Sequence, residues 1–463
     1  MKRLLLILAL VTLGSVHAEN FDYPLTHTRP LGEVLDEIAA RFKTRLKIEV
    51  DTAGCVLPYA ASRIRPYSIE ETLDNVLKPF NFKYVKQHAT YYKIKPYESH
   101  RRLPDEGARM VTYLTELCSH QAAFEERRAL VLDDLRRLLG TEIDCLRALT
   151  VQDAPMVLTK ARRYKGYTVQ NFRIETLRGL YLCGSIYAPD RLVRGDRYPL
   201  ILSPDGHTDR YADETQLRAA SWARMGAFVL TYDLVGYGES ALQLGSSVHH
   251  SYLAQVMQLM NGRILLDRML QRKEIDPARV GICGASGGGT QTMQLAALDD
   301  RFTASCPVIS LSSYFDGGCP CESAIQVVGA GGGTCNAELA ALTAPKPLGV
   351  VSDGKDWTAH VPTVELPYLK HIYGLYGVDD RVRNYHFPDE GHDFGWNKRQ
   401  AVYDFFAEVF RLNRAKVDES AVTIEQKEQL QLFGKEGSLL PATAVRQISD
   451  LPPYAAKRAR SLK

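Results

Sequence analysis

The sequence predicts a protein of the α/β class, with a mostly parallel sheet covered by helices on both faces and a small α+β domain before it. After residue 165, apolar runs such as "YPLILSP", "AFVLTYD" and "PLGVVSD" alternate with helical stretches such as "HHSYLAQVMQLMNGRILLDRMLQR". Strands that alternate with helices favour a parallel sheet buried between two helical layers. With 463 residues, 45% of them apolar, the chain is long enough for several domains with cores of their own.

The first 18 residues, "MKRLLLILALVTLGSVHA", have the pattern of a secretory signal peptide. Two cations precede an apolar run that is too short to span a membrane, and Ala18 follows as a cleavage residue. Loss of Lys2 and Arg3 leaves 55 basic against 54 acidic residues, so the mature chain is nearly neutral. We expect an exported protein, periplasmic or secreted, with no membrane span after cleavage and no nucleic-acid partner.

Residues 19–96 predict a small α+β module in the order helix, strand, helix and hairpin. "PLGEVLDEIAARFK" has apolar residues at helical spacing, and "RLKIEVD" alternates like a strand. "SIEETLDNVLKPF" begins with Ser68 as a cap and has Glu71 three residues later, and "NFKYVKQHATYYKIKP" indicates a hairpin. Over roughly 75 residues this pattern resembles the short N-terminal domain of secretins and TonB-dependent receptors. The resemblance implies a module that docks an envelope protein partner or only caps the fold.

The rest of the chain changes in composition at two places. Charged helical sequence such as "FEERRALVLDDLRRLLG" predicts a hairpin packed on the following domain, and the polar end of the chain is expected to pack loosely. The expected segments are a signal peptide at 1–18, the α+β module at 19–96, a helical hairpin at 97–160, a catalytic α/β domain at 161–413 and a C-terminal extension at 414–463.

The stretch "GICGASGGGTQTMQLAALDDRF" carries the strongest functional signal. A phosphate loop requires a Lys before its final Thr, and a dinucleotide site requires G-x-G-x-x-G; neither pattern is present. What fits is G-x-S-x-G, centred on Ser286, between a predicted strand and a predicted helix. On such a sharp turn the neighbours of the nucleophile must be small, and the Gly287 N–H lies where an oxyanion forms. We therefore favour a nucleophilic Ser286 over a packing turn.

A serine nucleophile requires a base and an acid that orients the base. Among twelve His, His392 in "FPDEGHDF" follows the last predicted strand, which gives the chain order of an α/β-hydrolase. The acid is expected on the loop "SDGKDWTAHVP". We choose Asp356 there because it lies past the turn, with Asp353 in reserve and Asp316 in "SSYFDGG" less favoured.

The loop "ILSPDGHTDRY" is expected to complete the oxyanion hole with a backbone N–H near Gly206 and His207. His249 and His250 are expected to cap a helix or to form a pocket wall. The expected lining of the substrate pocket is Trp357, Glu322 and Tyr237.

Nine Cys are spread along the chain, and their odd number leaves at least one unpaired. In "GGCPCES" the two Cys are too close to pair with each other comfortably, and one of them can pair with Cys306 or Cys335. No His lies near them to complete a zinc site. We expect a structural disulfide or buried thiols, no metal and no cofactor.

Residues 165–412 resemble bacterial α/β-hydrolases of the acetyl xylan esterase-like kind. The matching pieces are "PDGHTD", "YDLVGYGES", "GASGGGTQTMQLAALDDRF", "GGCPCES", "APKPLGVVSDGKDWT" and "VPTVELPYLKHIYGLYGVDDRV". The resemblance implies Ser286, Asp356 and His392 as the triad and places "GGCPCES" near the site. Two departures concern the oxyanion loop, where Asp205 stands in place of a His, and the sequence "DEGHDFGWN". Glucuronoyl esterases, which are similar in fold, carry Arg where Gly287 stands, and this difference counts against uronate esters.

The main hypothesis is a serine carboxylesterase that removes acetyl groups from plant polysaccharide or oligosaccharide. A peptidase of the same fold is an alternative, with Glu322 as an anchor for a peptide amine. A binding or assembly protein that docks through residues 19–96 is another. The sequence leaves the acyl group, the sugar and the oligomeric state open.

Overall fold

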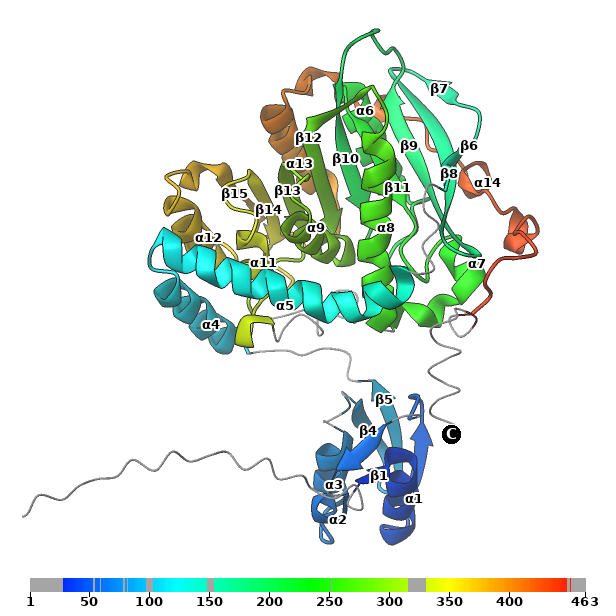
Figure 1. Cartoon of the computed structure of the whole chain (residues 1–463), viewed down its shortest axis with the longest axis vertical. Helices are drawn as coiled ribbons and strands as arrows, with labels where there is room; N and C mark the ends of the chain where they lie inside the picture. The colour runs from blue at the N-terminus through cyan, green and yellow to red at the C-terminus, as the bar shows by residue number, and fades with distance from the viewer. Residues whose placement is uncertain are drawn as a thin grey trace, which may run out of the picture. The chain divides into compact units, whose positions relative to one another are not determined.

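The computed structural model of the chain divides into two compact units, Met1–Tyr97 and Glu98–Lys463, shown in Figure 1. The residues that it describes are 28–52, 55–58, 60–77, 80, 82–96, 103–147, 154–250, 252–314, 330–447 and 450. The predicted signal peptide at 1–18 therefore lies outside the described residues.

The first unit is an α+β fold with a three-stranded sheet and a separate two-stranded one. Its elements are β1 (Thr28–Pro30), α1 (Leu31–Arg41), β2 (Arg45–Ile48), β3 (Val56–Pro58), α2 (Ala60–Arg63), α3 (Ile69–Leu77), β4 (Phe82–His88) and β5 (Tyr91–Pro96). A helix, a strand, a helix and a hairpin occur in this order as α1, β2, α3 and β4–β5, but β1, β3 and α2 were not predicted. The predicted cap of α3 is formed, because the Glu71 N–H donates to Ser68 Oγ at 3.1 Å. The docking of an envelope partner by this unit stays a prediction.

One face of the three-stranded sheet packs against α1 and α3. The strand order is β2-β5-β4, with β2 parallel and β4 antiparallel to the central β5. Fully buried side chains from the two helices and from β5 form the core: Leu31, Val34, Leu35, Ile38, Leu73, Val76, Leu77, Tyr92 and Ile94. Because side chains alternate along a strand, the neighbours of Tyr92 and Ile94 point to the opposite face.

The second unit begins with two helices, α4 (Pro104–Leu117) and α5 (Gln121–Arg147), which pack on the α/β part. The buried Arg127 guanidinium holds α5 in place. It donates to both carboxylate oxygens of Glu338, at 2.7 and 2.9 Å, and to the Gly333 carbonyl at 2.6 Å. A buried ion pair of this kind is costly to break because it leaves one charge uncompensated.

The α/β part is built on a ten-stranded sheet with the order β15-β14-β13-β12-β10-β11-β9-β8-β6, in which β7 pairs with β8. The pairs from β11 through β10 and β12 to β15 are parallel, whereas β9 runs antiparallel to both β11 and β8. The strands are β6 (Val157–Leu158), β7 (Arg162–Tyr164), β8 (Tyr167–Leu177), β9 (Leu180–Pro189), β10 (Tyr198–Pro204), β11 (Phe228–Tyr232), β12 (Ile275–Ala285), β13 (Ala304–Val308), β14 (Leu348–Asp353) and β15 (Val382–Phe387).

Helices cover both faces of this sheet, which confirms the predicted fold class. One core contains Leu202, Ile282 and Val350 with α8, α9, α11 and α12, and α8 and α9 lie in front of the sheet in Figure 1. The other contains Cys283 and Val351 with α6 and α13, because neighbouring strand residues point to opposite faces. The helices are α6 (Asp213–Met225), α7 (Ser240–Leu244), α8 (Tyr252–Leu270), α9 (Gly287–Leu298), α11 (Asn336–Ala341), α12 (Glu365–Gly374), α13 (Trp396–Phe410) and α14 (Lys427–Leu430).

Residues 414–447 of the C-terminal extension pack firmly, contrary to the expectation of loose packing. Leu430 and Phe433 are fully buried, and Glu239 Oε1 accepts the N–H groups of Leu432 and Phe433 at 2.7 and 2.6 Å. The expectation of loose packing was wrong because polar side chains in this segment form hydrogen bonds and ion pairs inside the fold. Glu425, for example, is almost fully buried and pairs with Arg162 at 2.6 Å.

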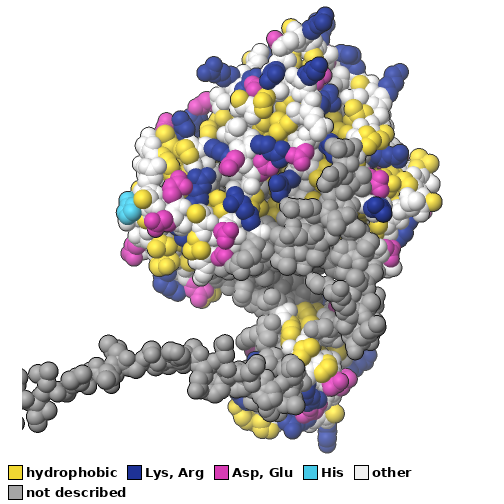
Figure 2. Space-filling view, in the orientation of Figure 1, with side chains coloured by type: hydrophobic (Ala, Val, Ile, Leu, Met, Phe, Trp, Pro, Cys, Tyr) yellow, Lys and Arg dark blue, Asp and Glu magenta, His cyan; other side chains and the backbone are white. Residues whose placement is uncertain are grey.

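Figure 2 shows cations and carboxylates interspersed over the visible face of the second unit. Among the described residues, no helix is both long and apolar enough to cross a membrane.

We predict that Phe433→Ala lowers the free energy of unfolding of the second unit by about 3–5 kcal/mol. The ring is fully buried beside Tyr181, at a centroid distance of 5.8 Å, so its removal leaves a cavity. Leu439→Ala is the matched control, because Leu439 is 66% exposed and its loss should change stability by less than about 0.5 kcal/mol. Denaturant unfolding measures both, and equal effects would contradict firm packing of the extension.

Candidate active site

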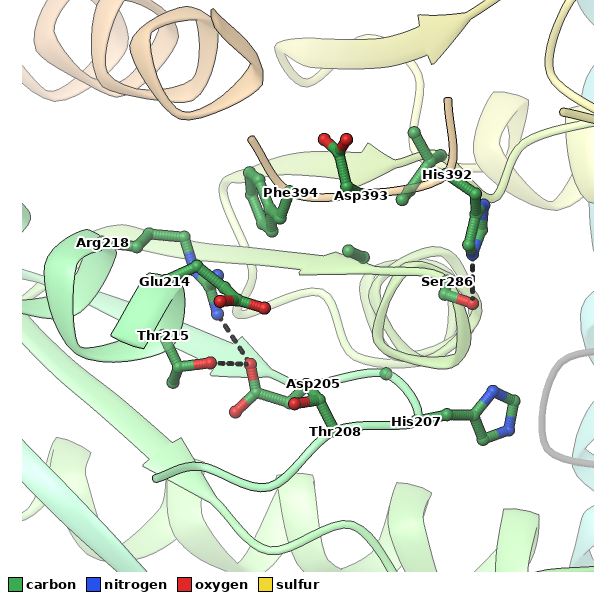
Figure 3. A pocket seen from close by; sticks show the side chains of 13 residues that line it. Asp205, His207, Thr208, Glu214, Thr215, Arg218, Ser286, His392, Asp393 and Phe394 are labelled. Carbon is green, nitrogen blue, oxygen red and sulfur yellow. Dashed lines mark hydrogen bonds and ion pairs between the residues drawn. The ribbon is translucent and has the colours of Figure 1, made fainter. Parts of the chain in front are cut away.

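Ser286 stands on a strained turn between β12 and α9. Its backbone has φ 54° and ψ −120°, a left-handed conformation that is rare for residues other than glycine. The turn presses against the end of β10, since a Cβ at Gly284 or Gly288 would lie less than 3.0 Å from the Pro204 carbonyl oxygen. The small residues of "GASGG" are therefore required by the close approach of two strand ends, and the serine side chain points into the cavity beyond them (Figure 3).

The structure brings Ser286, His392 and Asp356 together in one chain of contacts. His392 Nε2 lies 3.0 Å from Ser286 Oγ, and His392 Nδ1 lies 2.7 Å from Asp356 Oδ2. Figure 3 shows the first of these contacts. The three residues follow β12, β15 and β14, so the carboxyl ends of parallel strands place them at one edge of the sheet.

The surroundings of Asp356 keep it ionised. Burial alone would raise the pKa of its carboxyl, but hydrogen bonds from His392 and Thr358 outweigh burial and hold the pKa below its usual value. Both the N–H and the hydroxyl of Thr358 donate to Asp356 Oδ1 at 2.6 Å. Trp357 packs on the His392 ring at a centroid distance of 4.2 Å. An ionised, fixed carboxylate is what holds an imidazole in one tautomer.

Asp353, the reserve acid, has a different environment. It is fully buried and pairs with the buried ammonium of Lys398 at 3.3 Å. Burial and the nearby charge of Asp356 raise the pKa of the Asp353 carboxyl, although Lys398 opposes the shift. Lys398 also donates to the Gly391 carbonyl, so it ties the loop that carries His392 to the end of β14. The remaining candidate acid, Asp316, lies outside the described residues.

The loop after β10 contacts the serine turn directly. A Cβ at Gly206 would lie 2.7 Å from the Ala285 carbonyl oxygen and 3.0 Å from Ser286 Cβ, so only glycine fits there. Asp205 anchors this loop to α6, because it accepts from Arg218 at 2.7 Å and from Thr215 at 3.0 Å (Figure 3). The departure from the family pattern at Asp205 is thus an anchoring ion pair.

Aromatic side chains border the serine on the side of this loop. The exposed His207 ring lies 4.8 Å from His249 and 5.9 Å from Tyr237. His249 is buried and its Nδ1 lies 2.8 Å from the Val235 carbonyl oxygen, so it is a wall beneath His207. The side chain of His250 and the whole of Glu322 lie outside the described residues.

A cavity of about 210 Å³ opens beside Ser286 and His392. Its lining includes Gly206, His207 and Arg218, whereas Trp357 and Tyr237 are not part of the lining. Sequence reasoning missed Arg218 and Phe394, and the guanidinium of Arg218 lies 4.4 Å from the Phe394 ring. The only sequence signal for Arg218 was an unexplained charge in the apolar stretch "LRAASWARM".

Five Cys of the second unit are buried, namely Cys118, Cys183, Cys283, Cys306 and Cys335, whereas Cys55 in the first unit is half-buried. Cys283 and Cys306 are opposite each other on β12 and β13, and both are free thiols. Burial raises the pKa of the Cys306 thiol well above its usual value. The two Cys of "GGCPCES" lie outside the described residues. The pairing suggested between one of them and Cys306 is wrong, because Cys306 is a free thiol.

In the part of the chain that the structure describes, one group of side chains has metal-binding composition, namely Cys183, Asp233 and Glu239. The guanidinium of Arg210 already lies among them, at 2.9 Å from Asp233 and 2.8 Å from Glu239, and all are buried. A fixed positive charge in this position makes the group a structural ion-pair cluster.

No protein-family model and no curated protein matches the chain. Among solved structures, methylesterase BT1017 is 52% identical with a TM-score of 0.76, over 94% of this chain and 98% of its own. An acetyl xylan esterase from Paenibacillus sp. R4 is 16% identical with a TM-score of 0.43, over 60% of this chain and 94% of its own. A glucuronoyl esterase from Solibacter usitatus is 14% identical with a TM-score of 0.42, over 55% and 86%.

We predict that Asp356→Asn lowers kcat roughly 10⁴-fold, because an amide favours the wrong tautomer of His392. The loss of kcat caused by Asp353→Asn should be orders of magnitude smaller than the loss caused by Asp356→Asn. Asp353→Asn should instead destabilise the protein, because it leaves the buried Lys398 without its closest buried carboxylate. Turnover of an aryl ester and thermal unfolding of the two variants measure the difference. A larger kcat loss for Asp353→Asn would exchange the two assignments.

Proposed function

The chain belongs to the esterase family of α/β-hydrolases that includes methylesterase BT1017, and on that premise we propose that it is a serine carboxylesterase acting on carbohydrate. We propose further that it hydrolyses methyl esters of sugar carboxyl groups. The observation that carries the serine mechanism is the continuous contact from Ser286 through His392 to Asp356, at 3.0 and 2.7 Å.

In the first half of the reaction, His392 Nε2 takes the proton of Ser286 Oγ as the oxygen attacks the ester carbonyl carbon. The negative charge moves to the carbonyl oxygen, which the Gly287 N–H and an N–H of the Gly206–His207 segment stabilise. Gly287 begins α9, so its N–H has no acceptor within the helix. The bond to the leaving oxygen then breaks, His392 protonates that oxygen, and methanol departs from an acyl-enzyme.

In the second half, water repeats the attack on the acyl-enzyme. His392 takes a proton from the water, the oxyanion collapses, and the bond to Ser286 Oγ breaks as the serine recovers its proton. The products of one cycle are methanol and a carboxylic acid, which ionises at neutral pH. Each reaction therefore converts a neutral ester group of the polymer into an anionic carboxylate.

The rim of the site supports a carbohydrate. The exposed His207 lines the cavity beside Ser286, and the half-buried Trp357 packs on the ring of His392; both rings have one apolar face and a polar edge. Sugar rings present similar mixed faces of C–H and hydroxyl groups. The cavity also carries the carboxylates of Glu214 and Asp393, which can accept hydrogen bonds from hydroxyl groups (Figure 3).

Acetyl ester hydrolysis is the second candidate, as the sequence predicts. A cavity of about 210 Å³ beside Ser286 is large enough for the methyl group of an acetyl ester or of a methyl ester. The two reactions use the same residues and differ in which side of the ester bond carries the sugar. The Gly at 287, where glucuronoyl esterases carry Arg, is the sequence feature that counts against a uronate ester, and the support for a methyl ester is the 52% identity to a methylesterase over 94% of the chain.

Product analysis separates the two candidates. We predict that kcat/KM for methanol release from a methyl-esterified polyuronate is at least tenfold higher than kcat/KM for acetate release from acetylated xylan. A tenfold ratio corresponds to a difference of about 1.4 kcal/mol in transition-state binding free energy. Ser286→Ala should lose roughly 10³-fold or more of either activity. Acetate as the main product would favour the second candidate, and full turnover by Ser286→Ala would contradict the serine mechanism.

We propose that the protein is exported and that cleavage follows Ala18. The support is the charge and apolar pattern of residues 1–18. Mass spectrometry of protein from the periplasm or medium should then give a chain that begins at Glu19. Ala18→Arg should retain the precursor, because the cleavage site requires a small residue. A cytoplasmic chain that still begins at Met1 in the wild type would contradict the proposal.

A further inference from the structure

The outer face of the three-stranded sheet in the first unit is strongly basic. The register of β2, β5 and β4 places seven side chains on this face, which we call the basic sheet face: Arg45, Lys47, Lys83, Val85, Tyr91, Lys93 and Lys95. Tyr92 and Ile94, between them on β5, are buried on the inner face, which fixes the direction of the others. The described residues of the face thus include five cations.

One carboxylate lies among these cations in the part of the unit that the structure describes. Glu49 pairs with Lys47 at 2.7 Å and lies 3.8 Å from Lys95. A hydrogen bond from Lys47, aided by the positive charges of Lys93 and Lys95, lowers the pKa of the Glu49 carboxyl. Elsewhere in the unit, cations lie beside carboxylates of their own, as Arg29 does beside Glu37 and Lys86 beside Glu70.

The arrangement of the cations does not favour folding. In the strand register Lys47 is opposite Lys93, and Lys83 is opposite Lys95. Like charges directly opposite each other on neighbouring strands destabilise a sheet. All five side chains retain access to solvent, so a ligand can reach them. A bound polyanion would remove the repulsion.

We propose that the basic sheet face binds an acidic polysaccharide, namely a polyuronate with free carboxylates. This inference rests on the proposed function, because hydrolysis of methyl esters turns a neutral polymer into one that carries a carboxylate on each cleaved unit. The face would hold the chain where de-esterification has already occurred, while the second unit acts on ester groups elsewhere on the same polymer.

The spacing of the charges favours a polymer over a small anion. Residues two apart on a strand are separated by about 6.6 Å, and neighbouring strands by about 4.8 Å, so the five cations are spread over the sheet. Small anions require donors that converge on one point. A chain with regularly repeated carboxylates can instead contact several cations one after another.

The aromatic side chain on the face supports a sugar chain. The Arg45 guanidinium lies 5.2 Å from the centre of the Tyr91 ring, so a planar cation and a flat ring adjoin. Arg binds carboxylates with two parallel hydrogen bonds, and Tyr offers an apolar face with a polar tip. An anionic membrane is less suitable, because its peripheral ligands insert large apolar side chains, whereas Val85 and Tyr91 are both half-buried.

The test is affinity electrophoresis of the full chain through gels that contain polygalacturonate. A Ser286→Ala background prevents turnover. The charged polymer should retard this protein, and Lys93→Gln with Lys95→Gln should weaken binding on the order of tenfold, since two charge contacts are lost. Added salt should weaken it further. Arg191→Gln with Arg194→Gln, on an exposed loop of the second unit, is the control of equal charge change and should bind like the parent.

Further measurements separate this inference from the proposed function. In the presence of Ser286, the Lys93 and Lys95 variant should keep its kcat/KM on a small soluble methyl ester, because neither residue belongs to the esterase site. Equal retardation of this variant and the control would overturn the inference and leave the esterase proposal intact. Retention of the wild type by anionic phospholipid vesicles but not by polygalacturonate would also overturn it. Retardation without methanol release in any assay would instead overturn the proposed function.

Discussion

The close contact between the serine turn and the end of β10 is the constraint on which the site depends. Glycines at 284, 288 and 206 let three backbone segments approach within distances that no Cβ permits. This approach forces Ser286 into a left-handed conformation and brings the loop after β10 beside the first N–H groups of α9. Strain of this kind persists only where the surrounding structure holds it, and here parallel strands on both sides of β12 do so.

Two buried cations extend that constraint to the parts of the site that come from elsewhere in the chain. Arg218 binds Asp205 in the loop after β10 and packs on Phe394, two residues after His392. Lys398 pairs with Asp353, three residues before Asp356, and donates to the Gly391 carbonyl, one residue before His392. Both cations lie on helices that cover the same face of the sheet, α6 and α13. The loops that carry the site are therefore anchored to α6 and α13.

A third buried cation, Arg210, links the loop after β10 to the C-terminal extension through Glu239. Arg210, four residues after Gly206, pairs with Glu239, whose other oxygen accepts the N–H groups of Leu432 and Phe433. The C-terminal extension is thus part of the support for the loop after β10. Charged groups that are buried in pairs are costly to separate, so this link resists local opening near the serine.

The sequence by itself determined the fold class, part of the element order of the first unit and the residues proposed for the site. These follow from local patterns: apolar periodicity, a Ser cap at Ser68 and a glycine-flanked serine between a strand and a helix. Tertiary structure decided that Asp356 and not Asp353 contacts His392: Asp353 ends β14 and pairs with Lys398 on α13, whereas Asp356, three residues later, bonds to His392 and Thr358. It also decided the firm packing of the extension, the roles of Arg218 and Arg210, and the gathering of cations on one sheet face. Each of these depends on contacts or strand register between residues distant in the chain, which local periodicity does not record.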